Sequence, residues 1–329
     1  MKRITIITTG GTIAMAEDEQ SNSVKPKGME SFQSFFPLLS RYAQIEMDDF
    51  INLPSPHITP EWMYQIGKRI SYHLSRSEVD GVVVTHGTDT LEETAFYSDL
   101  TVPGNKPVVF TGAMRSQNEL GADGPVNLVN AIRTAAHPEA QGKGTLVVFN
   151  DEIHAARWVT KTHTSNVATF RSPAQGPVGT LTKKDIVFHQ SLTRNRLFPQ
   201  LPPVDDIFLI KAAVGTDDLF IRAALDQGAS GLVLESLGQG NLPPKMLPGL
   251  LDALKQNVPI VLVSRCYNGF VEDTYGYEGG GKQLKEWGVI FSNGLNGQKA
   301  RIKLMTALHV SRDATELQTL FKDSLRDRD

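Results

Sequence analysis

The sequence predicts an α/β fold built from mostly parallel strands that alternate with helices. Short apolar runs rich in β-branched residues recur along the chain, and each ends at glycine or polar residues. The runs are continuously apolar rather than alternating, which is typical of strands buried on both faces of a parallel sheet. Segments with helix-start signals separate the runs, so we expect right-handed crossover connections between the strands.

The apolar runs predict strands over residues 3–8, 81–85, 107–111, 144–150, 206–211, 231–234 and 259–264. Thr59 followed by Pro60 gives an N-cap and a proline at the first helical position, which predicts a helix to about residue 75. Pro125 likewise begins a helix to about residue 137, whose apolar face carries Val126, Val129, Ile132 and Ala136. Another helix begins near Leu91, and the remaining ones are expected over 217–227, 243–256, 298–310 and 313–325.

The length of 329 residues is enough for two domains of about 150 residues each. The stretch 191–204 contains Pro199, Pro202 and Pro203 without clear periodicity, so it is the predicted linker. A larger N-terminal α/β domain then covers residues 1–190, and a smaller C-terminal α/β domain covers residues 205–329. The alternative is a surface loop within one domain, although loops of this length are uncommon inside compact folds.

Composition and charge exclude several classes of protein. Lys and Arg number 33 against 36 Asp and Glu, which gives a net charge of −3 and a pI near 6.3. This balance offers no basic surface to a nucleic acid. No apolar stretch approaches the ~18 residues that a membrane helix requires. The single cysteine, Cys266, rules out an internal disulfide or a cysteine-based zinc site, and the eight histidines show no metal-binding spacing.

The N-terminus superficially resembles a signal peptide. Lys2 and Arg3 precede the apolar residues 4–7, and Ala14-Met15-Ala16 imitates a cleavage site. Residues 8–12, which are all threonine or glycine, interrupt the apolar region, so it is better interpreted as a buried strand running into a tight turn. We therefore expect a cytoplasmic protein.

Hydroxyl side chains beside glycines follow the first two predicted strands. Thr9-Gly10-Gly11-Thr12 comes after the first, and His86-Gly87-Thr88-Asp89-Thr90 comes after the second. Ligands of open α/β sheets bind outside the carboxyl ends of the strands, and glycines let backbone N–H groups approach a ligand closely. Taken singly, the glycines could form a tight turn, and either threonine of the second segment could cap the helix near Leu91. The dinucleotide-binding pattern G-x-G-x-x-G and the phosphate loop are both absent from the sequence.

Taken together, the segments T-G-G-T-I-A at residues 9–14 and H-G-T-D-T at residues 86–90 resemble the bacterial-type L-asparaginase family, in particular its cytoplasmic type I members. Five further segments resemble the same family, at residues 112–115, 121–128, 159–164, 238–242 and 295–301. The resemblance implies a two-domain asparaginase-like fold that hydrolyses L-asparagine to L-aspartate and ammonia without a metal or cofactor.

The resemblance also implies the catalytic residues. Thr12 matches the nucleophilic threonine, Thr88 matches the threonine of a second catalytic group, and Lys161 and Asp89 complete that group. A threonine hydroxyl is a poor nucleophile until a base removes its proton, which explains the need for these neighbours. The alternative interpretation of Lys161 is a structural ion pair with Asp89.

The expected substrate carries a carboxylate and an ammonium group on its α-carbon, so the site should combine donors with acidic side chains. Ser55 matches the family residue that contacts the carboxylate, with Gly87 beside it, and Asp89 is expected to hold the ammonium. Asn241 and Glu278 match residues that reach the site from a neighbouring subunit in the family. The resemblance therefore implies a homotetramer built as a pair of dimers. A solvated loop glutamate is the alternative for Glu278.

The sequence departs from the family pattern at two places. The segment 15–28 contains no tyrosine, whereas exported members usually carry one in the mobile loop near the nucleophile. Its polar part, residues 17–23, is expected to be a solvated loop or a lid. Pro56 occupies a position that is often glutamine, and it offers neither a backbone N–H nor a polar side chain. A dual asparaginase–glutaminase and a non-catalytic amino-acid sensor on the same fold are the alternative functions.

Overall fold

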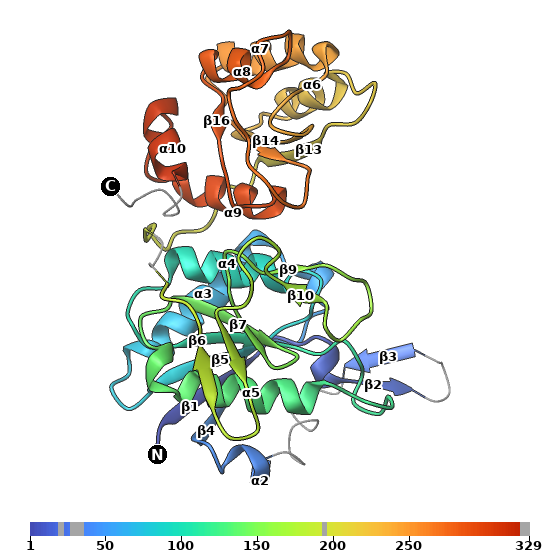
Figure 1. The fold of residues 1–329 in the computed structure, drawn as a ribbon. Helices are drawn as coiled ribbons and strands as arrows, with labels where there is room; N and C mark the ends of the chain where they lie inside the picture. Colours follow the sequence, from blue (N-terminus) through green and yellow to red (C-terminus); the bar gives the residue numbers. More distant parts are fainter. Residues whose placement is uncertain (19–22, 27–35, 193–195, 323–329) are drawn as a thin grey trace. The chain divides into compact units, whose positions relative to one another are not determined.

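The computed structural model describes residues 1–18, 23–26, 36–192 and 196–322. The chain divides into two compact units, Met1–Gln200 and Leu201–Asp329 (Figure 1). The division falls inside the predicted linker 191–204. The backbone N–H of Phe198 donates to the carbonyl of Leu100, and the Phe198 side chain is buried, so this part of the segment packs with the first unit.

The first unit is built on an eight-stranded sheet in which five neighbouring strands are parallel. Three further strands extend the sheet in antiparallel fashion on the side of β7. In spatial order the strands are β12 (Ile186–Phe188), β11 (Gly179–Leu181), β8 (Glu152–Ala155), β7 (Thr145–Phe149), β6 (Val108–Thr111), β5 (Gly81–Thr85), β1 (Arg3–Thr8) and β4 (Gln44–Asp49). The predicted mostly parallel α/β architecture is confirmed.

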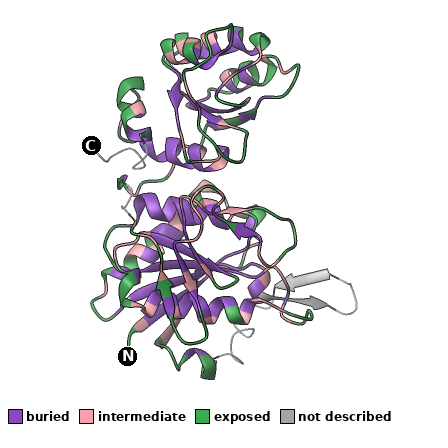
Figure 2. Ribbon diagram, viewed as in Figure 1, coloured by how far each residue is buried: buried purple, intermediate pink, exposed green. Residues whose placement is uncertain are grey.

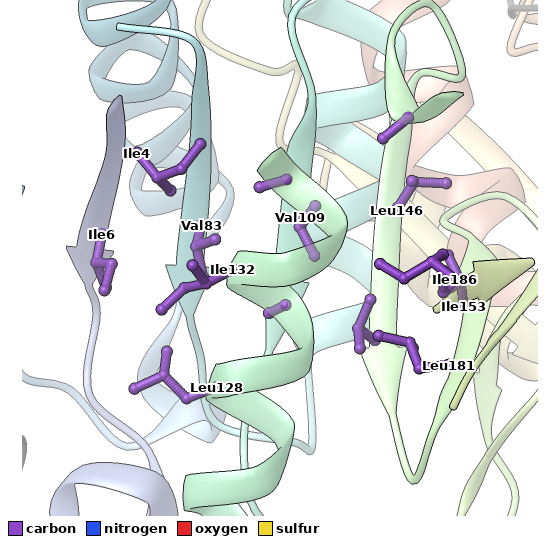
Figure 3. Packing of buried hydrophobic residues seen from close by; sticks show 14 of the residues in the cluster. Ile4, Ile6, Val83, Val109, Leu128, Ile132, Leu146, Ile153, Leu181 and Ile186 are labelled. Atoms are coloured by element: carbon purple, nitrogen blue, oxygen red, sulfur yellow. The ribbon is translucent and has the colours of Figure 1, made fainter. Parts of the chain in front are cut away.

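Three helices cover the two faces of this sheet. Buried residues of α5 (Gly124–Ala136) pack on one face, and those of α3 (Pro60–Ser75) and α4 (Leu91–Thr101) pack on the other. Successive residues of β5 alternate between the two sides: Val83 belongs to the α5 face, whereas Val82 and Val84 belong to the opposite one. Figure 3 shows the core on the α5 face. The central strands are buried almost throughout (Figure 2), as continuously apolar runs predict.

The second unit contains a four-stranded, fully parallel sheet in the order β13 (Ile207–Lys211), β14 (Gly231–Ser236), β15 (Ile260–Ser264) and β16 (Ile290–Phe291). All but the last of these strands were expected from their apolar runs. The helices of the unit are α6 (Leu219–Asp226), α7 (Leu247–Lys255), α8 (Gly281–Glu286), α9 (Gly297–Ala307) and α10 (Ala314–Phe321). The predicted helix 313–325 thus ends four residues early at Phe321, and its last three predicted residues lie outside the described ones.

The predicted helix over 243–256 is present over Leu247–Lys255, and the difference lies mainly in its first residues. A 3₁₀ turn, η4 (Pro244–Met246), precedes α7, which starts anew at Leu247. Pro248 explains the break: inside a continuous helix it would lack the N–H for a hydrogen bond and its ring would clash with the carbonyl four residues earlier. In the first turn of α7 the missing N–H costs nothing.

Of the segment 17–23, predicted as a solvated loop or lid, the described residues 17, 18 and 23 belong to two paired strands. β2 (Met15–Asp18) pairs antiparallel with β3 (Ser23–Pro26), and Met15 lies opposite Pro26. Pairing between the two strands satisfies backbone groups that an open loop would leave to water. Residues 19–22 of the predicted loop lie outside the described residues. Within the described part of the chain, no helix combines the length and the apolar character needed to cross a membrane.

Candidate active site

The turns after β1 and β5 touch each other. The two strands are parallel neighbours, with Thr8 opposite Thr85, so both chains leave the sheet at the same edge. Gly11 has φ +87°, and a Cβ there would lie 2.5 Å from the backbone N and Cα of Gly87. Only glycine tolerates both this dihedral angle and this approach. The contact sets Thr12, the first residue of the 3₁₀ turn η1 (Thr12–Ala14), beside the turn that carries Thr88.

Thr88, Asp89 and Lys161 form one hydrogen-bonded group. The Nζ of Lys161 donates to Oγ1 of Thr88 over 3.0 Å and to Oδ1 of Asp89 over 2.6 Å. Thr88 is buried, and the Lys161 side chain is 16% exposed, whereas that of Asp89 is 57% exposed. The group therefore joins a buried hydroxyl to a carboxylate open to a ligand. Lys161 therefore makes both an ion pair with Asp89 and a hydrogen bond to Thr88.

Ser55 reaches the same place from the loop after β4. It begins the 3₁₀ turn η2 (Ser55–His57), and its Oγ accepts a 3.1 Å hydrogen bond from the backbone N of Asp89. The Thr90 hydroxyl donates to the Ser55 carbonyl over 2.8 Å. A Cβ on Gly87 would lie 2.7 Å from Oγ of Ser55, so this glycine is needed for close packing. Three strand-end loops thus converge, and Pro56 is exposed beside them.

His86 lies beneath this turn as a neutral, fully buried ring. Its Nδ1 is 2.8 Å from the carbonyl of Gly87, which can only accept, so Nδ1 carries the proton. Nε2 has no hydrogen-bond partner among the described residues. Burial lowers the pKa of His86 from 6.5 to about 4, against the opposing effect of the Gly87 carbonyl. This setting suits a structural hydrogen-bonding role for His86 rather than acid–base work.

We expect His86 to make the fold less stable in acid. Its pKa is lower in the folded than in the unfolded chain, so the unfolded chain binds more protons between pH 6.5 and pH 4. This difference should remove about 3 kcal/mol from the free energy of unfolding by pH 4. Urea unfolding of His86→Asn and of the control His57→Asn, at an exposed histidine, measures it. The first variant should lose that part of the pH dependence, and equal pH dependence in both would contradict the assignment.

Sequence reasoning missed two contacts that hold the site. Gln117 donates from Nε2 to the carbonyl of Ile13 over 2.9 Å and so ties the turn that contains Thr12 to the loop after β6. Glu92 lies in the first turn of α4, where an acidic residue is favourable at a helix N-terminus. It is in fact 4% exposed and accepts a hydrogen bond from the Thr160 hydroxyl. One feature could have indicated that Glu92 is buried. It directly follows the apolar Leu91 at the start of a helix that is buried along almost its whole length.

Asn241 and Glu278 belong to the second unit, where their loops are joined. The backbone N of Leu242 donates to the carbonyl of Gly279 over 2.9 Å, which links the residue after Asn241 to the residue after Glu278. Oδ1 of Asn241 is buried without a hydrogen-bond partner in the described part of the chain. Glu278 is exposed. The remaining predicted residues, Thr12, Ser55, Gly87, Thr88, Asp89 and Lys161, all belong to the first unit.

Metal ligation has no candidate in the described ranges, where no three His, Cys, Asp or Glu side chains are arranged to hold an ion. Cys266 is exposed as a free thiol.

Comparison with known proteins identifies the family. Residues 3–194 match the family model of the asparaginase N-terminal domain, and residues 206–321 match that of the glutaminase/asparaginase C-terminal domain. L-asparaginase 2 of Bacillus subtilis (strain 168) is 38% identical over 98% of this chain and 87% of its own. A glutaminase-asparaginase of Pseudomonas fluorescens biotype A is 32% identical over 98% of this chain and 90% of its own.

Among solved structures, a probable cytoplasmic L-asparaginase from Campylobacter jejuni superposes with a TM-score of 0.87. It is 32% identical, and the match covers 98% of this chain and 99% of that one. The two family models together cover nearly the whole chain, and the relatives share both domains. The chain is therefore a member of the bacterial-type L-asparaginase family.

Proposed function

We propose that this protein hydrolyses L-asparagine to L-aspartate and ammonia, with Thr12 as the nucleophile. The observation that carries the proposal is the hydrogen-bonded group of Thr88, Lys161 and Asp89 beside the turn that holds Thr12. Such a group brings an amine and a carboxylate to a hydroxyl at the carboxyl edge of a parallel sheet, where α/β enzymes bind their ligands.

The proposed reaction has two steps. The Thr12 oxygen attacks the side-chain amide carbon, the C–N bond breaks, and ammonia leaves with the proton that the hydroxyl gives up. Water then attacks the acyl ester, and Thr12 regains its proton as aspartate departs. In each step a proton must move to and from an oxygen, and Lys161 and Thr88 are the groups proposed to carry it. Asp89, which is paired with the amine, orients Lys161 and faces the substrate ammonium.

Substrate recognition is proposed to use Ser55 and Gly87 for the α-carboxylate and Asp89 for the α-ammonium. Asn241 and Glu278 are proposed to complete the site from a neighbouring subunit, in a homotetramer made of two dimers. The exposure of Glu278 and the unpartnered buried Oδ1 of Asn241 support this role, since both leave an acceptor without a described partner. We also propose a cytoplasmic location, because a solved structure that superposes on this chain is a probable cytoplasmic L-asparaginase.

Ammonia release by the purified protein tests the function. We expect stoichiometric ammonia and aspartate from L-asparagine, and none from the protein alone. Binding of asparagine without ammonia release would instead support the alternative of a non-catalytic sensor.

Mixing two inactive variants tests the shared site. Thr12→Ala and Glu278→Ala proteins should each be impaired, and a mixture that exchanges subunits should regain activity, because one site of each hybrid dimer is then intact. The measurement is ammonia release before and after mixing, with each variant mixed with itself as the control. A fully active monomer in sedimentation at assay concentration would contradict the proposal.

We expect kcat/KM to favour L-asparagine over L-glutamine by at least about tenfold. Glutamine is longer by one methylene, which is worth ~1–3 kcal/mol of discrimination. Pro56 is rigid and adds no polar contact, so the loop that holds the α-carbon end adjusts little to a displaced substrate. Kinetics of both amides with wild type and Pro56→Gln measure this. Equal kcat/KM values in the wild type would favour the dual asparaginase–glutaminase, the activity named in the Pseudomonas relative.

A further inference from the structure

We propose that Glu92 is a positioning residue that holds the backbone of Lys161 so that its amine meets Thr88; this inference rests on the proposed function. Glu92 lies in the first turn of α4, directly after the segment that carries Thr88 and Asp89. Residues 88–92 would then fix both the amine and the backbone of Lys161.

The contacts of Glu92 point to the strand that carries the lysine. Its Oε1 accepts from the Thr160 hydroxyl over 2.9 Å and from the backbone N of Lys161 over 3.4 Å. Glu92 is buried, with 4% of its surface exposed. Burial of a carboxylate is costly unless hydrogen-bond donors surround it, so a glutamate at this position requires specific hydrogen-bonding partners. The N-terminal turn of α4 adds a favourable partial positive charge.

The residues that flank this strand are anchored by other contacts, since Val159 is fully buried in the core and the backbone N of Thr162 donates to the carbonyl of Thr169. β9 (Thr160–Lys161) and β10 (Phe170–Arg171) form a separate two-stranded ribbon in which each strand has two residues. So short a ribbon is marginal without outside support. β10 is held by its Phe170 ring, which stacks on Phe149 of β7 at 4.3 Å between centroids. Glu92 supplies the corresponding attachment for β9, at the residue where the chemistry is proposed.

Attachment at the backbone matters because the lysine side chain is long. Ordering a lysine side chain costs up to about 2 kcal/mol of conformational entropy. The contacts to Thr88 and Asp89 fix only its amine end. When Glu92 fixes the backbone of Lys161, the side chain starts from a defined position, and its Nζ lies 3.0 Å from Oγ1 of Thr88. A misplacement of about 1 Å in a catalytic group can cost about 10²-fold in rate.

The inference is tested with Glu92→Ala, Thr160→Val and the double variant. Glu92→Ala should lower kcat for asparagine by about tenfold to a hundredfold while KM changes by less than about threefold. Thr160→Val removes only the hydroxyl donor and should lower kcat less. The double variant should be no slower than Glu92→Ala, because the hydroxyl contact that Thr160→Val removes is already lost in Glu92→Ala. Glu92→Gln keeps an acceptor oxygen and should restore most of the rate.

Glu93→Ala is the matched control, since it removes a carboxylate from the same helical turn. An equal fall in kcat in this control, or additive effects in the double variant, would overturn the inference. If Glu92→Ala does not fold, Thr160→Val alone tests the positioning role of Glu92. An unchanged kcat in Thr160→Val would then overturn the inference.

Crystal structures of wild type and Glu92→Ala give a readout that does not depend on activity. The distance from Lys161 Nζ to Thr88 Oγ1 should lengthen beyond hydrogen-bonding range in the variant. A lengthened distance in a protein whose wild type releases no ammonia would refute the proposed function and keep the positioning role. An unchanged distance together with an unchanged kcat would refute the positioning role alone.

Discussion

Thr12→Ala and Thr88→Ala are each expected to lower kcat for L-asparagine by at least about 10³-fold. In the proposed mechanism Thr12 provides the oxygen that bonds to the substrate carbon, so its loss should remove the covalent route altogether. Thr88 accepts a hydrogen bond from Lys161 and is proposed to link this amine to the reacting centre, where a positioned acid–base group contributes about 10²–10⁴-fold. Steady-state ammonia release by the folded variants, monitored beside their circular dichroism, measures both effects.

Serine at either position tests whether the hydroxyl itself is responsible. Thr12→Ser and Thr88→Ser keep the oxygen and should recover a large part of the lost rate. Thr180→Ala is a suitable control, because Thr180 lies on β11 and its hydroxyl pairs with His189. Near-normal kcat in a folded Thr12→Ala or Thr88→Ala protein would refute the threonine mechanism.

In the first unit, the strands that the sequence predicted are buried on both faces along almost their whole length. β1, β5, β6 and β7 appear as continuous apolar runs because helices cover each side. β4, with the sequence Gln-Ile-Glu-Met-Asp-Asp, was not predicted. It lies at the sheet edge and is largely half-buried, so its polar residues hide the pattern. β9 and β10 have two residues each, which is too few for any periodicity.

The candidate site was predictable only in part, because only some of its residues follow strands that the sequence predicts. Thr12 and Thr88 follow strands, so their meeting at one sheet edge follows from parallel neighbours. Lys161 is 73 residues from Thr88 along the chain and lies on a ribbon outside the main sheet. No local pattern predicts that contact, and only the family resemblance pointed to it. Glu92 was missed because a first-turn glutamate is usually a solvated partner of the helix dipole.

Gly11→Ala is expected to lower the free energy of unfolding by about 2–5 kcal/mol and to reduce kcat/KM strongly. The substitution forces a Cβ onto a backbone at φ +87° and to 2.5 Å from Gly87, whose main chain cannot yield without moving Thr88. Gly142→Ala separates backbone strain from steric contact. Gly142 has φ +73°, but an added Cβ there would meet nothing within 4 Å. That control should lose only about 1 kcal/mol and keep its activity. Equal losses of stability and activity in the two variants would show that backbone strain alone, and not the contact between the two turns, makes glycine necessary at position 11.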